Sequence, residues 1–323
     1  MNSWTIPNVG PILAPGQLHP AFDKAHAGAA HVLRHGDTCH LYYWGRGDQG
    51  NVILRAESPA ADPNRWSPAG GVLLKAQPET DYNADGPSFP FVLPVTDTRW
   101  LMYVCTWGRK RVENRLPNST GAAISDDAGR TWLYAGEAPV LPLDRPWDRS
   151  GTGSVWVLLE NGLFRMYYTA IGRYFPKPPG VQTGHGDVIP EIGIGYAESR
   201  DGLVWTKPVA DLLVRPRGFA VEPYEYICSK PCVVKDGPGY IMWVNTFGTA
   251  YRVHRLTSLD GLHWTWAKRQ GPDGELGTGS PGAFDDHQRS YPCMLRHENE
   301  WRCWYTGNAF GRTGMGYAVA PAS

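Results

Sequence analysis

The chain has 323 residues, of which 42% are hydrophobic and only 19% charged, and its 31 Lys and Arg balance 31 Asp and Glu. A net charge of zero argues against a surface that binds nucleic acid over its whole extent. The apolar runs are far shorter than the roughly 20 residues that span a bilayer, and the N-terminus shows no basic and apolar leader. We therefore expect a cytoplasmic protein with neither a nucleic-acid partner nor a membrane partner.

A pair of strands recurs along the chain. The first strand of each pair is short and apolar, and the second is an aliphatic and aromatic run that ends near glycine. The first strands begin near residues 31, 90, 155, 231 and 292, and the second strands cover 41–45, 101–108, 166–172, 241–248 and 303–307. Gly, Asp and Asn lie between the two strands, which is the pattern of a β-hairpin.

In most units a third strand follows and leads to a turn that ends in Trp. These turns cover residues 125–132, 199–205 and 258–264, and a looser version in the first unit ends at Trp66. Asp in such a turn bonds the turn backbone, Gly adopts a positive φ, and the Trp begins a fourth strand. Four-stranded units repeated radially predict an all-β fold, a five-bladed β-propeller with four antiparallel strands per blade.

The last unit lacks its fourth strand. The N-terminal segment 3–13 resembles segment 205–213, the fourth strand of the third unit. We therefore expect the N-terminal strand to join the last blade and close the ring, so that residues 1–323 form a single domain. The six cysteines lie mostly inside strands, which favours free buried thiols in the cytoplasmic protein that we expect.

Acidic residues recur just before the first strands. In a propeller these strands begin at one face of the central channel, so residues upstream of them converge. Alignment on Ala30, Pro90, Val155, Pro231 and Pro292 places Asp23, Asn83, Asp148, Tyr224 and Asp285 at one position, with Glu225 and Asp286 one step further and Asp85 two steps beyond Asn83. Paired carboxylates supply the acid and the base of glycoside hydrolysis. The alternative is that each Asp only caps a turn.

Five four-stranded blades entered by acids resemble the five-bladed glycosidases of glycoside hydrolase families 43, 32 and 130. The resemblance to family 43 implies that Asp23 is the base, that Asp148 tunes the pair, and that a Glu of the fourth blade is the acid. By position this acid is Glu225, whereas Glu222, in Val-Glu-Pro, better fits the family's Glu close before Pro. The Asn-Asp-Pro-Asn signature of family 32 is missing.

A second group of residues follows the second strands. It comprises Arg46, Arg109, Arg173 and Arg312, which would clamp a substrate carboxylate or phosphate or, alternatively, pair with the acids at the channel mouth. We further expect Asp85, Asp285, Asp286, Trp44, Trp107, His185 and His287 to bind substrate, with the two tryptophans stacking on sugar faces. We expect no cofactor. The alternative is a structural calcium ion in the channel, because His287 beside two aspartates resembles a family 43 feature.

Together these patterns predict a glycoside hydrolase that cleaves a small saccharide, with an anionic substrate favoured where the arginines are unpaired. Two alternatives stay open. One is a propeller that binds carbohydrate or protein without catalysis, and the other is a phosphate-dependent glycoside phosphorylase. The sequence does not determine the sugar, the linkage, the stereochemical outcome or the oligomeric state.

Overall fold

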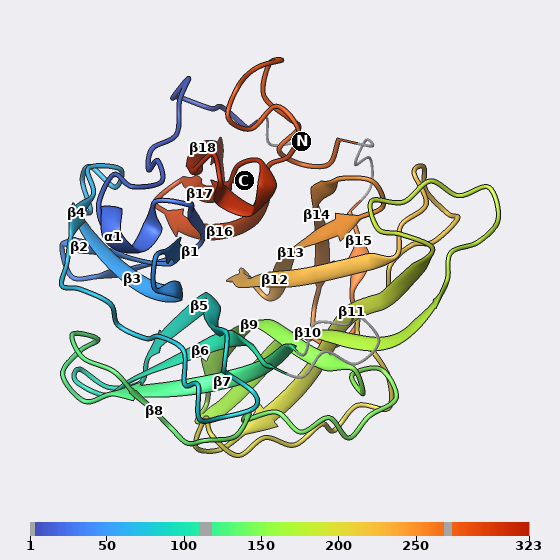
Figure 1. The fold of residues 1–323 in the computed structure, drawn as a ribbon, viewed down its shortest axis with the longest axis horizontal. Helices are drawn as coiled ribbons and strands as arrows, with labels where there is room; N and C mark the ends of the chain where they lie inside the picture. Colours follow the sequence, from blue (N-terminus) through green and yellow to red (C-terminus); the bar gives the residue numbers. More distant parts are fainter. Residues whose placement is uncertain (1–3, 110–117, 268–272, 323) are drawn as a thin grey trace.

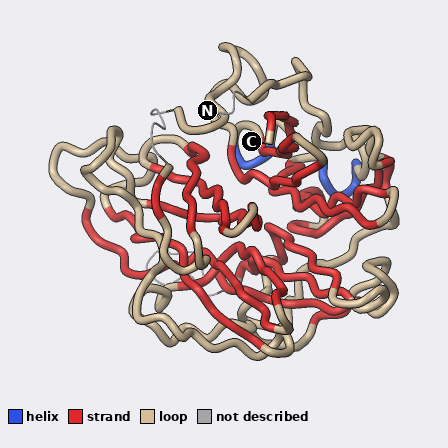
Figure 2. The backbone as a smooth tube through the Cα atoms, turned by 180° about the vertical axis from the view of Figure 1, so that it is seen from behind, coloured by secondary structure: helices blue, strands red, loops and turns tan. Residues whose placement is uncertain are grey.

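The computed structural model describes residues 4–109, 118–267 and 273–322. In this part of the chain, strands dominate, and helix is limited to the single turns α1 (Pro20–Asp23) and η1 (Ala309–Gly311). Figure 2 shows from behind that loops and strands make up almost the whole backbone. The predicted all-β class is confirmed. No helix in the described residues is long and apolar enough to cross a membrane.

The first two units are four-stranded antiparallel sheets. One contains β1 (His26–His35), β2 (Thr38–Gly47), β3 (Gly50–Pro59) and β4 (Ser67–Pro68), and the other contains β5 (Gly86–Pro94), β6 (Trp100–Trp107), β7 (Asn118–Ser125) and β8 (Leu133–Tyr134). Neighbours in the chain are neighbours in each sheet. The hairpins predicted from alternating apolar runs and Gly-rich turns are therefore present in both units.

The third and fourth units share a seven-stranded sheet. It contains β9 (Gly151–Glu160), β10 (Leu163–Pro176), β11 (Val188–Ser199), β12 (Ile227–Asp236), β13 (Gly239–Phe247), β14 (Tyr251–Ser258) and β15 (Thr265–Trp266). Two antiparallel meanders, β9–β11 and β12–β15, meet at one parallel pair, Ile192 with Ile227. A single pair is a weak junction, so each meander keeps its own hairpin geometry.

The last unit contains three strands in one sheet, β16 (Ser290–His297), β17 (Glu300–Thr306) and β18 (Met315–Pro321). The N-terminal segment lies against its outer strand. Thr5 pairs with Val319 and Leu13 with Met315 in antiparallel bridges, and the Thr5 N–H donates to the Val319 carbonyl at 2.8 Å. The two ends of the described chain thus lie side by side.

The first strands of the units lie nearest the middle of the molecule, and the short fourth strands lie at its periphery (Figure 1). Around the middle, β1 contacts β5, β5 contacts β9, β9 contacts β12, β12 contacts β16, and β16 contacts β1. This succession of contacts gathers residues that are far apart in the sequence around one axis.

The turns that end in Trp join neighbouring units. Trp132 packs edge-on against Tyr42, Trp205 against Tyr103, and Trp264 against Tyr167, in each case a tyrosine of the preceding unit. Gly202 has a φ of +77°, and a Cβ there would lie 2.9 Å from the Tyr103 hydroxyl oxygen. Glycine is therefore required both by the turn and by the approach of the neighbouring unit. The six cysteines are free and buried, as predicted.

Candidate functional site

The inner strands contain a break in register close to their starts. It falls between Gly28 and His31 in β1, Ser88 and Phe91 in β5, Ser229 and Cys232 in β12, and Ser290 and Cys293 in β16. At these breaks Ala29, Phe89, Lys230 and Tyr291 have φ values of 53°, 48°, 46° and 54°. An extra residue in an antiparallel strand bends the strand and redirects a side chain. Three of the redirected side chains, those of Phe89, Lys230 and Tyr291, line a common cavity.

This central cavity has a volume of about 490 Å³. Its aromatic lining consists of Trp44, Phe89, Trp107, Tyr174, Tyr251, Tyr291 and Phe310, and its polar lining includes Asn118, Ser154, Thr169, His185, Ser229 and Lys230. Among the residues that the structure describes, no Asp or Glu lines it. The volume lies in the range of small-molecule sites, and the mixture of rings and hydroxyl groups suits a polar ligand with apolar faces.

The aromatic side chains form a continuous wall. Trp44 stacks on Phe89 with ring centroids 5.7 Å apart, Phe89 meets the edge-on ring of Tyr291 at 4.9 Å, and Tyr291 stacks on Phe310 at 6.2 Å. The indole of Trp107 is fixed by a hydrogen bond from Nε1 to Ser88 Oγ of 2.7 Å. Such a wall presents its rings in set orientations, because neighbouring rings restrict one another.

The three aspartates that precede the first, third and fifth units share one arrangement. Each is buried and accepts a hydrogen bond from a tyrosine on the second strand of its own unit. The hydroxyl of Tyr43 donates to Asp23 Oδ2 at 2.8 Å, that of Tyr168 to Asp148 Oδ2 at 2.7 Å, and that of Tyr305 to Asp285 Oδ2 at 2.7 Å. None of the three aspartates lines the central cavity.

Further donors differ between the three aspartates. The backbone N–H of Gly16 donates to Asp23 Oδ1 at 3.1 Å, Lys207 Nζ lies 2.6 Å from Asp148 Oδ2, and Arg289 Nε lies 2.6 Å from Asp285 Oδ2. These contacts satisfy carboxylates that burial would otherwise leave without partners. They tie the loop before each inner strand to the body of its unit.

The second and fourth units lack both members of this pair. The strand registers place Val104 and Val244 where the other units have tyrosine, and the aspartate position holds Asn83 and Tyr224. The aspartate and its tyrosine partner thus occur in the same three units and are both missing from the other two. This is expected if the pair stabilises the loop before the inner strand. The catalytic roles of Asp23 and Asp148 stay predictions.

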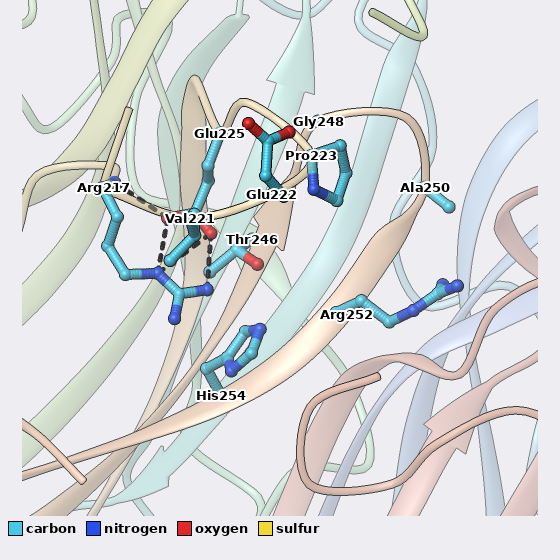
Figure 3. A pocket seen from close by; sticks show the side chains of 10 residues that line it. All are labelled: Arg217, Val221, Glu222, Pro223, Glu225, Thr246, Gly248, Ala250, Arg252 and His254. Atoms are coloured by element: carbon cyan, nitrogen blue, oxygen red, sulfur yellow. Dashed lines mark hydrogen bonds and ion pairs between the residues drawn. The ribbon is translucent and has the colours of Figure 1, made fainter. Parts of the chain in front are cut away.

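Glu225 and Glu222 line a second cavity, of about 380 Å³, with Arg217, Arg252 and His254 (Figure 3). Glu225 is 3% exposed, and both of its carboxylate oxygens accept hydrogen bonds from the Arg217 guanidinium. Nη2 donates to Oε2 at 2.6 Å, and Nε is shared between Oε2 at 3.1 Å and Oε1 at 3.2 Å. The carboxylate of Glu222 is exposed and points away from the Arg217 guanidinium. The Arg217 guanidinium therefore fixes the carboxylate of Glu225, whereas the carboxylate of Glu222 is exposed to solvent.

The predicted arginines lie outside the residues that line the central cavity. Arg173 pairs with Glu191 at 3.0 Å, and the Arg109 guanidinium donates to the Pro78 carbonyl. Arg312 Nε approaches His26 Nε2 at 3.4 Å, and Arg46 lies opposite His26 in the β1–β2 register. Burial, with the charges of Arg312 and Arg46, lowers the pKa of His26 to about 4.

Of the remaining predicted residues, the structure brings Trp44, Trp107 and His185 into the central cavity. Burial lowers the pKa of His185. Asp85 and His287 are exposed and outside the cavity. Asp286 accepts hydrogen bonds from the Gly282 N–H at 2.7 Å and from Asn308 Nδ2 at 2.8 Å. In the described part of the chain, no three His, Cys, Asp or Glu side chains are grouped as metal ligands, and the calcium ion stays a prediction.

The residues at the strand bulges were not among the predicted site residues. Phe89, Lys230 and Tyr291 each stand directly before a proline, Pro90, Pro231 and Pro292. A residue before proline is driven out of the helical region, and proline inside a strand favours a bulge or an edge. The dipeptides were therefore a usable signal for the residues that face the axis.

Comparison with known proteins gives relatives from one organism and a wider set of similar folds. No family model matches the chain. Two proteins of Mycobacterium tuberculosis, uncharacterized proteins MT1551 and Rv1502, are each 30% identical over 298 and 301 residues, which cover 88% of this chain and 88% of each relative. The chain belongs to the family of MT1551 and Rv1502. Because both relatives are uncharacterized proteins, membership of this family does not by itself indicate an activity.

Several solved structures with a fold similar to this member of the MT1551 family are glycoside hydrolases. BT0996, solved in an RGII complex, has a TM-score of 0.72 at 18% identity, and the match covers 98% of this chain and 92% of BT0996. A structure from work on the GH130 family of mannoside phosphorylases has 0.68 at 14%, covering 100% and 96%. A thermostable family-43 glycoside hydrolase has 0.62 at 14%, covering 96% and 91%. The predicted resemblance to propeller glycosidases is confirmed, and at these identities it establishes the fold alone.

Proposed function

We propose that the protein is a glycoside-active β-propeller that holds a saccharide in its central cavity. One observation carries the proposal. Inner strands from different units direct aromatic rings and polar groups into a single cavity of about 490 Å³ at the axis. Sugars have apolar ring faces and polar edges, so a wall of rings beside hydroxyl and amide groups suits them.

The architecture that we propose for this function is a single domain of five blades in a closed ring. Its support is the succession of contacts from β1 through β5, β9, β12 and β16 back to β1. The bridges of Thr5 to Val319 and of Leu13 to Met315 would make the N-terminal segment the outer strand of the last blade. In the third blade the bridge between Glu198 and Thr206 would mark the outer strand.

Hydrolysis is the second candidate function, and the position of Glu222 favours it. Hydrolysis needs one carboxylic acid to protonate the leaving oxygen and a second carboxylate to act on the other face. Glu222 and Glu225 line one cavity, and Glu222 is exposed while Glu225 is held by Arg217. We propose Glu222 as the acid in that case, with the glycosidic bond in this second cavity and not in the central one. Asp23 and Asp148, the other predicted members, line neither cavity.

A binding experiment tests the saccharide site. Isothermal titration with a panel of neutral and acidic monosaccharides and their methyl glycosides should reveal binding to the unmodified protein. Trp107→Ala removes a stacking ring and should weaken that binding about tenfold. Phe219→Ala, an exposed ring outside the cavity, is the matched control and should bind as the parent does. No binding across the panel, or equal binding by both variants, would refute the site.

The same panel of sugars, as aryl glycosides, separates the two candidate functions. Turnover that falls by a factor of about 100 or more in Glu222→Gln supports hydrolysis with this acid. Turnover that appears only with inorganic phosphate indicates a phosphorylase. Binding without any turnover leaves saccharide recognition as the function of the cavity.

A further inference from the structure

Lys230 occupies the bulge of β12 and lines the central cavity. The residue is 4% exposed. Its ammonium group donates to the Pro292 carbonyl at 3.3 Å, and no ion pair with a carboxylate is formed within residues 4–109, 118–267 and 273–322. An ammonium group taken out of water is costly unless an opposite charge compensates it. The described part of the chain therefore supplies no negative charge to compensate the ammonium group of Lys230.

A second buried lysine of the same chain, Lys207, has its charge compensated by carboxylates. The Lys207 side chain is 1% exposed, and its Nζ lies 2.8 Å from Asp144 Oδ1 and 2.6 Å from Asp148 Oδ2. Lys207 lines neither cavity, whereas Lys230 lines the central one. The lysine that lines the central cavity is the one without a carboxylate partner in the described part of the chain.

The titratable groups around Lys230 do not provide the missing charge. They are His31 of β1, Cys232 of β12, Cys293 of β16 and Cys303 of β17. Burial raises the pKa of each of the three thiols, so they are neutral at physiological pH. Burial, and then the Lys230 charge, lowers the pKa of His31 to about 3. Burial lowers the pKa of Lys230 itself.

The backbone that carries Lys230 is held by buried side chains. Thr169 Oγ1 accepts the Lys230 N–H at 2.9 Å, and Asn245 Nδ2 donates to the Lys230 carbonyl at 3.3 Å. Thr169 Oγ1 also bonds Ser154 Oγ at 3.0 Å. The bulge is thus fixed before any ligand arrives, and Ser154 and Thr169 add hydroxyl groups beside it. Such preorganisation lowers the entropic cost of binding.

We propose that Lys230 binds the anionic group, a carboxylate or a phosphate, of the saccharide in the central cavity. This inference rests on the proposed function and narrows its substrate to acidic sugars. A ligand anion against the ammonium group would supply the charge that the cavity lacks, in surroundings where charge-assisted hydrogen bonds are strong. In this proposal a lysine at the axis binds the anion, in place of the arginines that were predicted from the sequence.

The test compares acidic and neutral sugars on matched variants. Isothermal titration at pH 7 is done with glucuronate, galacturonate, glucose 6-phosphate, glucose and galactose on the unmodified protein, Lys230→Met and Lys235→Met. Lys235 lies on the same strand, with a side chain that is 62% exposed and paired with Glu160, and it lines neither cavity. At least one acidic sugar should bind tenfold or more tightly than its neutral counterpart, and only Lys230→Met should remove the preference. The uronates and the sugar phosphate separate carboxylate from phosphate.

A pH titration of the unmodified protein gives a readout that does not depend on a variant. Because the ammonium form binds the anion and the free amine does not, affinity for the acidic sugar should fall as the pH rises through the pKa of Lys230. Affinity for the neutral sugar should stay constant.

The outcomes distinguish the two levels of the proposal. Equal affinity for acidic and neutral sugars, or a preference kept by Lys230→Met, overturns the role of Lys230 and leaves the saccharide site standing. Binding by none of the sugars overturns both.

Discussion

Burial decides the charge state of single residues along the axis of this protein. His31 is 5% exposed, packs against the rings of both Phe91 and Trp156, and is hydrogen-bonded through Nε2 to the Val92 carbonyl at 3.0 Å. Burial, and then the charge of Lys230, lowers its pKa to about 3. A neutral imidazole therefore sits beside a lysine at the centre of the molecule, and protonation of His31 opposes folding.

The stability of the protein should accordingly fall in mild acid. The folded-state pKa of His31 lies below the value of about 6.5 in the unfolded chain, so below pH 6.5 the unfolded state binds more protons. The stabilisation is complete above pH 6.5 and declines toward pH 3, by about 1.4 kcal/mol per pH unit. Urea unfolding at pH 7.5, 6.5 and 5.5 measures this slope.

Two variants assign that slope to His31. His31→Gln keeps a hydrogen-bond donor and has no titrating ring, so it should lose this share of the slope between pH 6.5 and 5.5. His263→Gln, whose parent side chain is 90% exposed, should keep the slope of the unmodified protein. An unchanged slope in His31→Gln would show that other groups cause the loss of stability in acid.

At the scale of elements, the hairpins and the turns ending in Trp could be predicted because their signals are local. In a Ser-x-Asp turn the aspartate accepts hydrogen bonds from the backbone of the same turn. Asp201 Oδ1, for example, accepts the N–H groups of Leu203 and Val204, both at 2.8 Å. The directions of side chains at the inner strands could not be predicted, because a bulge shifts the register by one residue and so changes which side chain faces the axis. The carboxylates of Asp23 and Asp148 bind tyrosines of their own units, whereas Lys230, at a bulge, lines the cavity.

The aspartate–tyrosine pairs anchor the loops before the inner strands, and they should differ in strength. In Tyr43→Phe, Asp23 would keep the Gly16 N–H, whereas in Tyr305→Phe, Asp285 would keep the Arg289 guanidinium. Loss of a hydrogen bond to a buried charged group costs about 1.5–3 kcal/mol. Tyr43→Phe should therefore lose about that much stability in urea unfolding, and Tyr305→Phe should lose less. No loss in either variant would argue against a bracing role, and equal losses would contradict the predicted difference in strength.

At the scale of the whole molecule, the succession of contacts between the inner strands explains how residues from distant segments line one cavity. Phe89, Lys230 and Tyr291 belong to three different sheets and still line one cavity. The sequence predicted this convergence on an axis from the repeat alone, but from aspartates that precede the strands. The bulges inside the strands supply the residues of the central cavity instead.

The N-terminal segment offers a test of the proposed closure of the ring. Leu13 is fully buried against the last unit, and its carbonyl accepts the Met315 N–H at 2.9 Å. Leu13→Ala should lower the free energy of unfolding by about 2–5 kcal/mol through the cavity that it leaves. Thr5→Pro removes the N–H that donates to Val319 and should also destabilise the last unit.

The control and a local measurement make the closure test specific. Val9, which is 97% exposed, lies in the same segment, so Val9→Ala should change stability by no more than about 0.5 kcal/mol. In Leu13→Ala and Thr5→Pro, the amides of Met315 and Val319, which donate to this segment, should exchange hydrogen faster, while those of the β5–β6 hairpin keep their protection. If both variants keep the stability and the exchange rates of the parent, the N-terminal segment does not stabilise the last unit, and the proposed closure of the ring by this segment is wrong.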